Sequence, residues 1–220
     1  MLEGAANART LCSVGTDDGL YELIQAIARR DGSALAMLEA RPSLARVSVA
    51  AGATRENPKD WFFEGIGHYV YAGDTALHVA AAAYDVPLAT RLLALGADVN
   101  AANRRGAAAL HYACDGATDD AAFDDAQYAV VTLLIASGSN PNALDKSGVA
   151  PLHRAVRTRR AAAVRALLDG GADASLANKS GSTPLELANM TTGRGGSGTP
   201  AARAEQQAII AMLEAATLKA

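Results

Sequence analysis

The sequence predicts an all-α solenoid, in which short helix–turn–helix units are stacked and joined by β-hairpin-like loops. Three observations support this fold class. The phrase GDTALH, which begins at Gly73, returns as GAAALH, GVAPLH and GSTPLE further along the chain. The glycines that open these phrases are 33, 42 and 33 residues apart, and two short apolar segments follow the first of them. A repeat of this length indicates units that bury their apolar faces only against their neighbours, so we expect one elongated domain.

The repeated phrases resemble a known family. A unit of 33 residues that opens with threonine, proline, leucine and histidine is the signature of the ankyrin repeat. The phrase GADVN, which ends at Asn100 after the second apolar segment, has the later counterparts GSNPN and GADAS. The chain therefore resembles the ankyrin-repeat family over roughly residues 73–216. The resemblance implies stacked helix pairs and the binding of another protein.

Composition and charge argue against several classes of protein. The net charge is −3 and the isoelectric point is near 5.8, so the chain as a whole does not indicate nucleic-acid binding. No apolar run reaches the roughly 18 residues of a membrane span, and we expect no membrane partner. Cys12 and Cys114 lie far apart, which predicts a reducing compartment such as the cytoplasm. No phosphate-binding loop, zinc-protease motif or nucleophile elbow occurs, so we expect no cofactor and no enzyme.

The repeats also set the expected domain organisation. An N-terminal arm over 1–17 precedes a single domain over 18–220. That domain is divided into a degenerate capping repeat over 18–47, an aromatic-rich linker over 48–72, repeats over 73–105, 106–147 and 148–180, and a C-terminal capping repeat over 181–220. The second full repeat has nine extra residues between its helices, and the last helix is expected from about Ala204 to Leu218.

The motif histidines His78, His111 and His153 occupy the same place in three successive repeats. They could form a metal or catalytic cluster. The family resemblance implies instead that each ring bonds the loop and the helix N-terminus within its own repeat. Stacked helices lie about 8–10 Å apart, too far for one zinc ion with bonds of about 2 Å, so we expect no metal site. Thr75 and Thr183 belong to the same motif, and the Thr75 hydroxyl is expected to accept a hydrogen bond from the first turn of its helix.

The partner-binding positions are also carried over from the family, repeat by repeat. Ankyrin arrays generally bind their partner on the concave face and hairpin tips. The matching positions here are Tyr71, Arg104, Arg105, Lys146 and Lys179 at the tips, and Arg157 at the end of a first helix. They form a basic stripe on an acidic protein, although exposed tips are often charged for solubility alone. We hypothesise that the chain is a monomer that binds an acidic segment of another protein in a regulatory or scaffolding role.

The linker is a second candidate surface, because it holds five of the ten aromatic residues of the chain: Trp61, Phe62, Phe63, Tyr69 and Tyr71. Tryptophan and tyrosine are common in interface hot spots. The same side chains could instead form a lid that seals the core of the capping repeat. We favour the lid for Phe62 and Phe63, and keep Trp61 and Tyr69 as candidate partner contacts.

An alternative function is a receptor for a small ligand or a metal ion. It would use the aromatic linker, with His68 beside Tyr69, and the acidic insertion of the second full repeat. The aspartates there are Asp115, Asp119, Asp120, Asp124 and Asp125. Their spacing matches no EF-hand loop, so a solvated acidic loop is the preferred interpretation. A deep apolar pocket beside Trp61 would favour the receptor, and a shallow open groove would favour the protein-binding module.

Overall fold

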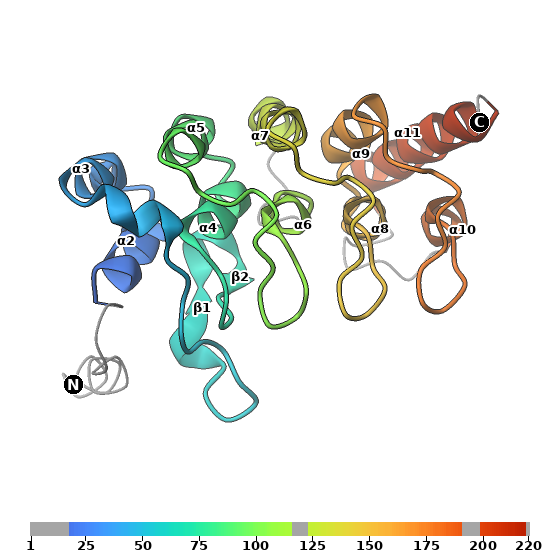
Figure 1. The fold of residues 1–220 in the computed structure, drawn as a ribbon. Helices are drawn as coiled ribbons and strands as arrows, with labels where there is room; N and C mark the ends of the chain where they lie inside the picture. Colours follow the sequence, from blue (N-terminus) through green and yellow to red (C-terminus); the bar gives the residue numbers. More distant parts are fainter. Residues whose placement is uncertain (1–17, 116–122, 191–198, 219–220) are drawn as a thin grey trace.

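The computed structural model describes residues 18–115, 123–190 and 199–218, and it confirms the all-α solenoid of paired helices. The helices form two stacked rows, and the connecting loops descend from one side of the stack (Figure 1). The first row contains α2 (Asp18–Arg29), α4 (Ala76–Ala82), α6 (Ala109–Ala113), α8 (Pro151–Arg157) and α10 (Pro184–Asn189). The second row contains α3 (Ser33–Ala40), α5 (Val86–Ala94), α7 (Asp124–Ala136), α9 (Ala161–Asp169) and α11 (Pro200–Thr217).

The core is continuous between the two rows and between successive units. Each motif histidine is preceded by a fully buried leucine and followed two residues later by a fully buried alanine. These alanines are Ala80, Ala113 and Ala155. Their small side chains allow the helices of neighbouring repeats to approach closely, which explains how such short helices bury a continuous core.

The capping repeat at the N-terminus has the predicted helix pair. Leu20, Leu23, Ile24 and Ile27 recur at helical spacing along α2, and all four are buried. A 3₁₀ helix, η1 (Pro42–Arg46), follows α3 and leads toward the next unit. The guanidinium Nε of Arg46 donates a hydrogen bond to the Leu95 carbonyl at 2.9 Å, which ties the cap to the first full repeat.

The linker forms a small antiparallel hairpin rather than a loose loop. It contains two 3₁₀ turns, η2 (Lys59–Trp61) and η3 (Glu64–Ile66), and two strands, β1 (Phe62–Phe63) and β2 (His68–Tyr69). In the hairpin, Phe62 pairs with Tyr69 and Phe63 with His68. Ile66 is buried, and its 3₁₀ turn packs against α2. The linker therefore covers the apolar side of the capping repeat.

Two expectations about the linker aromatics are wrong. Trp61 is only 5% exposed and packs edge-on against Tyr21, with ring centroids 5.3 Å apart, so it belongs to the lid and not to a contact surface. Phe62, expected in the lid, is 39% exposed beside Tyr69, which is 38% exposed. The cause is the alternation of side chains along a strand, which places the paired residues Phe62 and Tyr69 on one face and Phe63 on the other.

The hairpin tips are held in register by backbone hydrogen bonds between successive repeats. The Arg104 amide donates to the Ala72 carbonyl at 2.8 Å, and the Lys146 amide donates to the Arg105 carbonyl at 2.9 Å. The motif glycines make this approach possible. Gly148 has a φ of +69°, and a Cβ there would lie 2.6 Å from the Cβ of Lys179. A side chain would therefore both strain the backbone and push the neighbouring tip away.

Three further findings complete the fold. The last helix begins at Pro200 rather than near Ala204, because the Thr199 hydroxyl accepts a hydrogen bond from the Ala202 amide at 3.1 Å and caps it there. Asp119 and Asp120 fall outside the described residues. None of the helices in the described part is long and apolar enough to cross a membrane.

We predict that Trp61→Ala destabilises the protein by about 3–5 kcal/mol, because it empties a site filled by a large aromatic ring. Phe62→Ala is the matched control, since Phe62 follows Trp61 in the chain and its side chain is exposed. Thermal unfolding followed by circular dichroism should show a marked fall in Tm for Trp61→Ala and little change for Phe62→Ala. Equal Tm values for the two variants would contradict the lid assignment.

Candidate functional site

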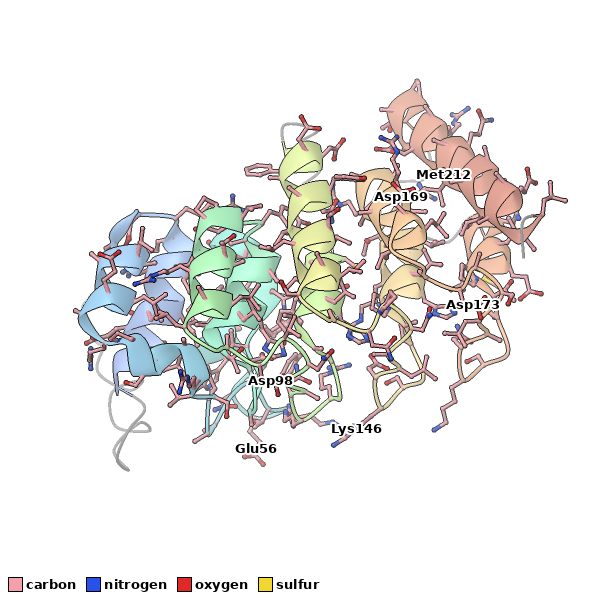
Figure 2. The ribbon with its side chains drawn as sticks, turned by 45° about the horizontal axis from the view of Figure 1, so that its top comes forward. Glu56, Asp98, Lys146, Asp169, Asp173 and Met212 are labelled. Carbon is pink, nitrogen blue, oxygen red and sulfur yellow. The ribbon has the colours of Figure 1, made fainter. Side chains whose placement is uncertain are left out.

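The predicted basic stripe is exposed along the hairpin tips. Its exposed members are Arg104, Arg105, Lys146 and Lys179. Figure 2 shows Lys146 extending away from the tip of its loop. Arg157 is also exposed, but it lines a separate recess with Met190 and Ile209 near the end of α8. The structure therefore separates Arg157 from the other residues of the stripe.

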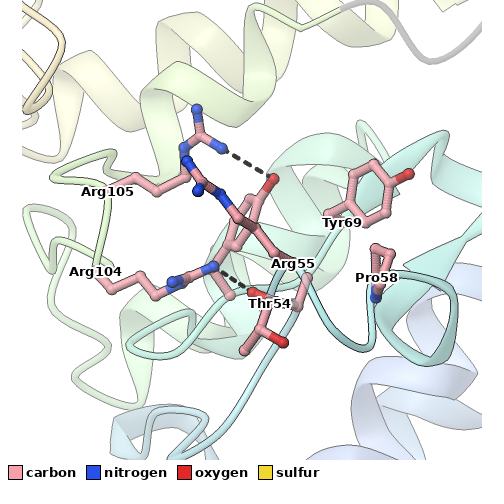
Figure 3. Close-up of a pocket in the computed structure, with 8 residues that line it drawn as sticks. Thr54, Arg55, Pro58, Tyr69, Arg104 and Arg105 are labelled. Carbon is pink, nitrogen blue, oxygen red and sulfur yellow. Dashed lines mark hydrogen bonds between the residues drawn. The ribbon is translucent and has the colours of Figure 1, made fainter.

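Four of the predicted contact residues line one cavity. Tyr69 and Tyr71 come from the linker, and Arg104 and Arg105 come from the tip between the first and second full repeats. Together with Ala53, Thr54, Arg55 and Pro58 they enclose about 390 Å³ (Figure 3). Within the part of the chain that the structure describes, no acidic side chain lines the cavity. Three guanidinium groups therefore face one hollow whose walls are otherwise aromatic, apolar or uncharged.

Tyr71 positions two of these arginines. Its ring centroid lies 5.2 Å from the Arg104 guanidinium carbon and 5.0 Å from that of Arg105, both within the range of cation–π attraction. Arg105 also donates to the Tyr71 hydroxyl at 3.2 Å, and Arg104 donates to the Ala53 carbonyl. These contacts orient both guanidinium groups before any partner arrives.

A buried polar network centred on Asp74 holds the backbone of Tyr71 in place. The fully buried Asp74 carboxylate accepts hydrogen bonds from the Tyr71 amide at 2.6 Å, the Tyr112 hydroxyl at 2.6 Å and the Asn103 side-chain amide at 2.8 Å. Asn103 in turn accepts from the Arg105 amide at 2.8 Å. Burial, reinforced by the negative charge of Asp74, raises the pKa of Tyr112 well above its usual value, so its hydroxyl remains a donor. The network connects the linker, α6 and the arginine-bearing tip.

A second polar cluster occupies the face beside the cavity and involves His68. The Nε2 atom of His68 lies 3.1 Å from Asp115 Oδ2, and its Nδ1 atom lies 2.8 Å from the Tyr69 carbonyl oxygen. Arg154 donates to Asp115 at 2.7 Å and to Asp145 at 2.9 Å. Burial opposes ionisation of Asp115, but the His68 hydrogen bond and the Arg154 charge outweigh it and hold the pKa of Asp115 below its usual value. His68 thus attaches the linker to the second and third full repeats.

The remaining candidate ligands that the structure describes do not assemble into a metal site. Within residues 18–115, 123–190 and 199–218, no group of three or more histidine, cysteine, aspartate or glutamate side chains is placed to hold a metal ion. The charged lining residue that the sequence did not reveal is Arg55. It lies in the linker, which has no counterpart in the repeats, so repeat equivalence could not assign it a position.

Comparison with known proteins adds a decisive observation on the family. A family model described as "Ankyrin repeat" matches residues 72–104, and a second, described as "Ankyrin repeats (many copies)", matches residues 134–188. The chain belongs to the ankyrin-repeat family. No curated protein gives a significant match to the chain. Ankyrin repeats are generally protein–protein interaction modules and typically act as non-catalytic binding scaffolds.

Two of the ankyrin motif histidines, His78 and His111, bond within their own repeat as expected and also connect it to the next repeat. His78 accepts a hydrogen bond from the Thr75 amide at Nδ1, and its Nε2 atom lies 3.1 Å from the Ala107 carbonyl oxygen in the next repeat. His111 repeats this arrangement, with its Nε2 atom 3.2 Å from the Val149 carbonyl oxygen. An acceptor at Nδ1 and a donor at Nε2 define a neutral ring with its proton on Nε2.

The motif threonines Thr75 and Thr183 have different hydrogen-bond partners at the starts of their helices. Thr75 occupies the N-cap of α4, where its hydroxyl lies 3.0 Å from His78 Nδ1. Thr183 forms a capping box: its hydroxyl accepts from the Glu186 amide at 3.3 Å, and its own amide donates to the Glu186 carboxylate at 2.8 Å.

Burial governs the titration of the motif histidines. It lowers the pKa of His78 and of His153, and it lowers the pKa of His111 from 6.5 to about 4, with a smaller contribution from the Arg154 charge. The unfolded chain therefore binds protons more readily than the folded chain between pH 6.5 and about 4. The stability contributed by neutral His111 is complete above pH 6.5 and is lost as the pH falls through this window.

We predict that the free energy of unfolding falls between pH 7 and pH 5, with a loss of about 2 kcal/mol from His111 alone. Urea unfolding at the two pH values measures the difference. The matched control is His111→Gln, which removes the titrating ring and should show a smaller difference between pH 7 and pH 5. A wild-type stability that is the same at both values would contradict the buried neutral ring.

Proposed function

We propose that this ankyrin-repeat domain binds an acidic segment of a partner protein across its hairpin tips, with the arginine–tyrosine cavity as the principal contact. The observation that carries the proposal is the convergence of Arg55, Arg104 and Arg105 on a cavity whose described lining residues include no acidic side chain. None of the three forms an ion pair with another described residue, whereas Arg154 and Arg41 do. Carboxylates on a partner would supply the missing counter-charges.

The other tip residues of the basic stripe are consistent with an extended partner. Lys146 and Lys179 continue the positive charge along the two following tips, and both are exposed. The exposed rings of Phe62 and Tyr69, with centroids 4.8 Å apart, provide an apolar surface beside the cavity. Aromatic side chains next to arginines are typical of interface hot spots. In this proposal the chain acts as a monomer in the cytoplasm and regulates or scaffolds its partner.

The small-ligand or metal receptor gains no support from the described residues. Trp61 lines the core instead of a pocket, and His68 is held by Asp115 and the Tyr69 carbonyl. The cavity that does exist is lined by arginines, which favour an anionic partner group.

The proposal predicts that peptides selected by the full chain from a displayed library are enriched in aspartate and glutamate. Arg104→Glu/Arg105→Glu should weaken their binding at least about tenfold, which corresponds to about 1.4 kcal/mol. The matched control is Arg91→Glu/Arg165→Glu, an equal change of charge at exposed sites on α5 and α9 of the second row. Its effect should be small, because charges further than about 8 Å from the peptide are screened at physiological ionic strength.

Isothermal titration at low and high salt provides the second measurement, with affinity expected to fall as salt rises. Each variant is first checked for an unchanged Tm. Selected peptides without an acidic bias, or equal losses in the two double variants, would contradict the proposal.

A further inference from the structure

The cavity differs from the rest of the basic stripe in how closely its charges are grouped. Lys146 and Lys179 each present a single charge on a separate tip, whereas Arg55, Arg104 and Arg105 line one hollow. Like charges brought together repel one another, and no carboxylate among the described residues of the cavity wall offsets that repulsion. A ligand that enters between the three guanidinium groups should therefore bind more tightly the more negative charge and the more acceptor atoms it carries.

The donors of the cavity are only partly engaged. A guanidinium group has five N–H donors in a planar fork. One contact of Arg104 goes to the Ala53 carbonyl and one of Arg105 to the Tyr71 hydroxyl, and the ring of Tyr71 fixes the orientation of both groups. Arg55 extends toward the same hollow from the opposite loop (Figure 3). The remaining N–H groups are available to an anion.

A phosphate monoester meets these donors better than a carboxylate does. Near neutral pH it carries about −1.5 to −2 charges and three acceptor oxygens, so it can pair with more than one guanidinium at once. A carboxylate has one charge and two oxygens, which suit a single arginine fork. The cavity, at about 390 Å³, falls in the size range of small-ligand sites. Pro58 and the ring of Tyr69 add apolar wall for the stem of a phosphorylated side chain.

We infer that the cavity formed by Arg55, Arg104, Arg105 and Tyr71 is a receptor for a phosphate monoester carried by a phosphorylated side chain of the partner. The inference rests on the proposed function, since it assigns the central contact of the same acidic segment. Phosphorylation of the partner then controls binding: the lysines of the following tips hold flanking acidic residues, and the three arginines hold the phosphate. Phosphotyrosine and phosphoserine present the same group on different stems.

The test compares synthetic peptides of equal net charge by isothermal titration with the full chain. Two pentapeptides carry four glutamates around a central phosphotyrosine or phosphoserine, and a peptide of six glutamates matches their charge. We expect at least one phosphopeptide to bind ten or more times tighter than the glutamate peptide, and the tighter of the two identifies the stem. Phosphopeptides that bind no tighter than the glutamate peptide would overturn the inference and leave the proposed function standing. Binding of none of the peptides would contradict both.

A pair of variants distinguishes the cavity from general attraction. Arg55→Gln and Lys146→Gln each remove one positive charge from an exposed side chain on the loop side of the array. Arg55→Gln should abolish the preference for the phosphopeptide, while Lys146→Gln should weaken phosphopeptide and glutamate peptide alike and preserve the preference. Equal loss of preference in both variants would overturn the cavity as the site. Tm values within error of the wild type establish that both variants are folded.

Discussion

The structure depends on the links that the neutral rings of His78 and His111 make between successive repeats. Short helices such as α6 are too brief to be stable alone, so their order comes from contacts with neighbouring units. His78 and His111 each accept from the amide that starts their own helix and reach a backbone carbonyl of the next repeat. One side chain thus satisfies a helix N-terminus and fixes the position of the following hairpin.

The stacking of successive repeats also forms the candidate site. The site is assembled from two segments that no single repeat contains, the linker and the tip that carries Arg104 and Arg105. The tip is placed by its backbone bond to Ala72, and the linker is placed by the hydrogen bonds of Asp74. Tyr71, which lies between them, can then orient both arginines. The cavity is therefore a property of the stacked array, and a change that loosened the stacking would also disperse its charges.

Much of the fold could be predicted from the sequence, because the repeats place equivalent residues in equivalent environments. The positions of Arg104 and Arg105 at an exposed tip followed from that equivalence. The burial of Trp61 and the exposure of Phe62 did not, because the pairing of a two-residue strand in a unique linker decides which face each ring takes. Arg55 was missed for the same reason, since its approach to the tip depends on a fold of the linker that no repeat predicts.

The dependence on neutral histidines can be tested most directly by nuclear magnetic resonance of the ring nitrogens in a ¹⁵N-histidine-labelled chain. At pH 6, where a free imidazole is largely protonated, His78 and His111 should show one protonated and one unprotonated nitrogen, with the proton on Nε2. Each Nε2 proton should exchange slowly, as expected for a buried hydrogen bond. Two protonated nitrogens in either ring at pH 6, or a proton on Nδ1, would contradict the link between repeats on which this account depends.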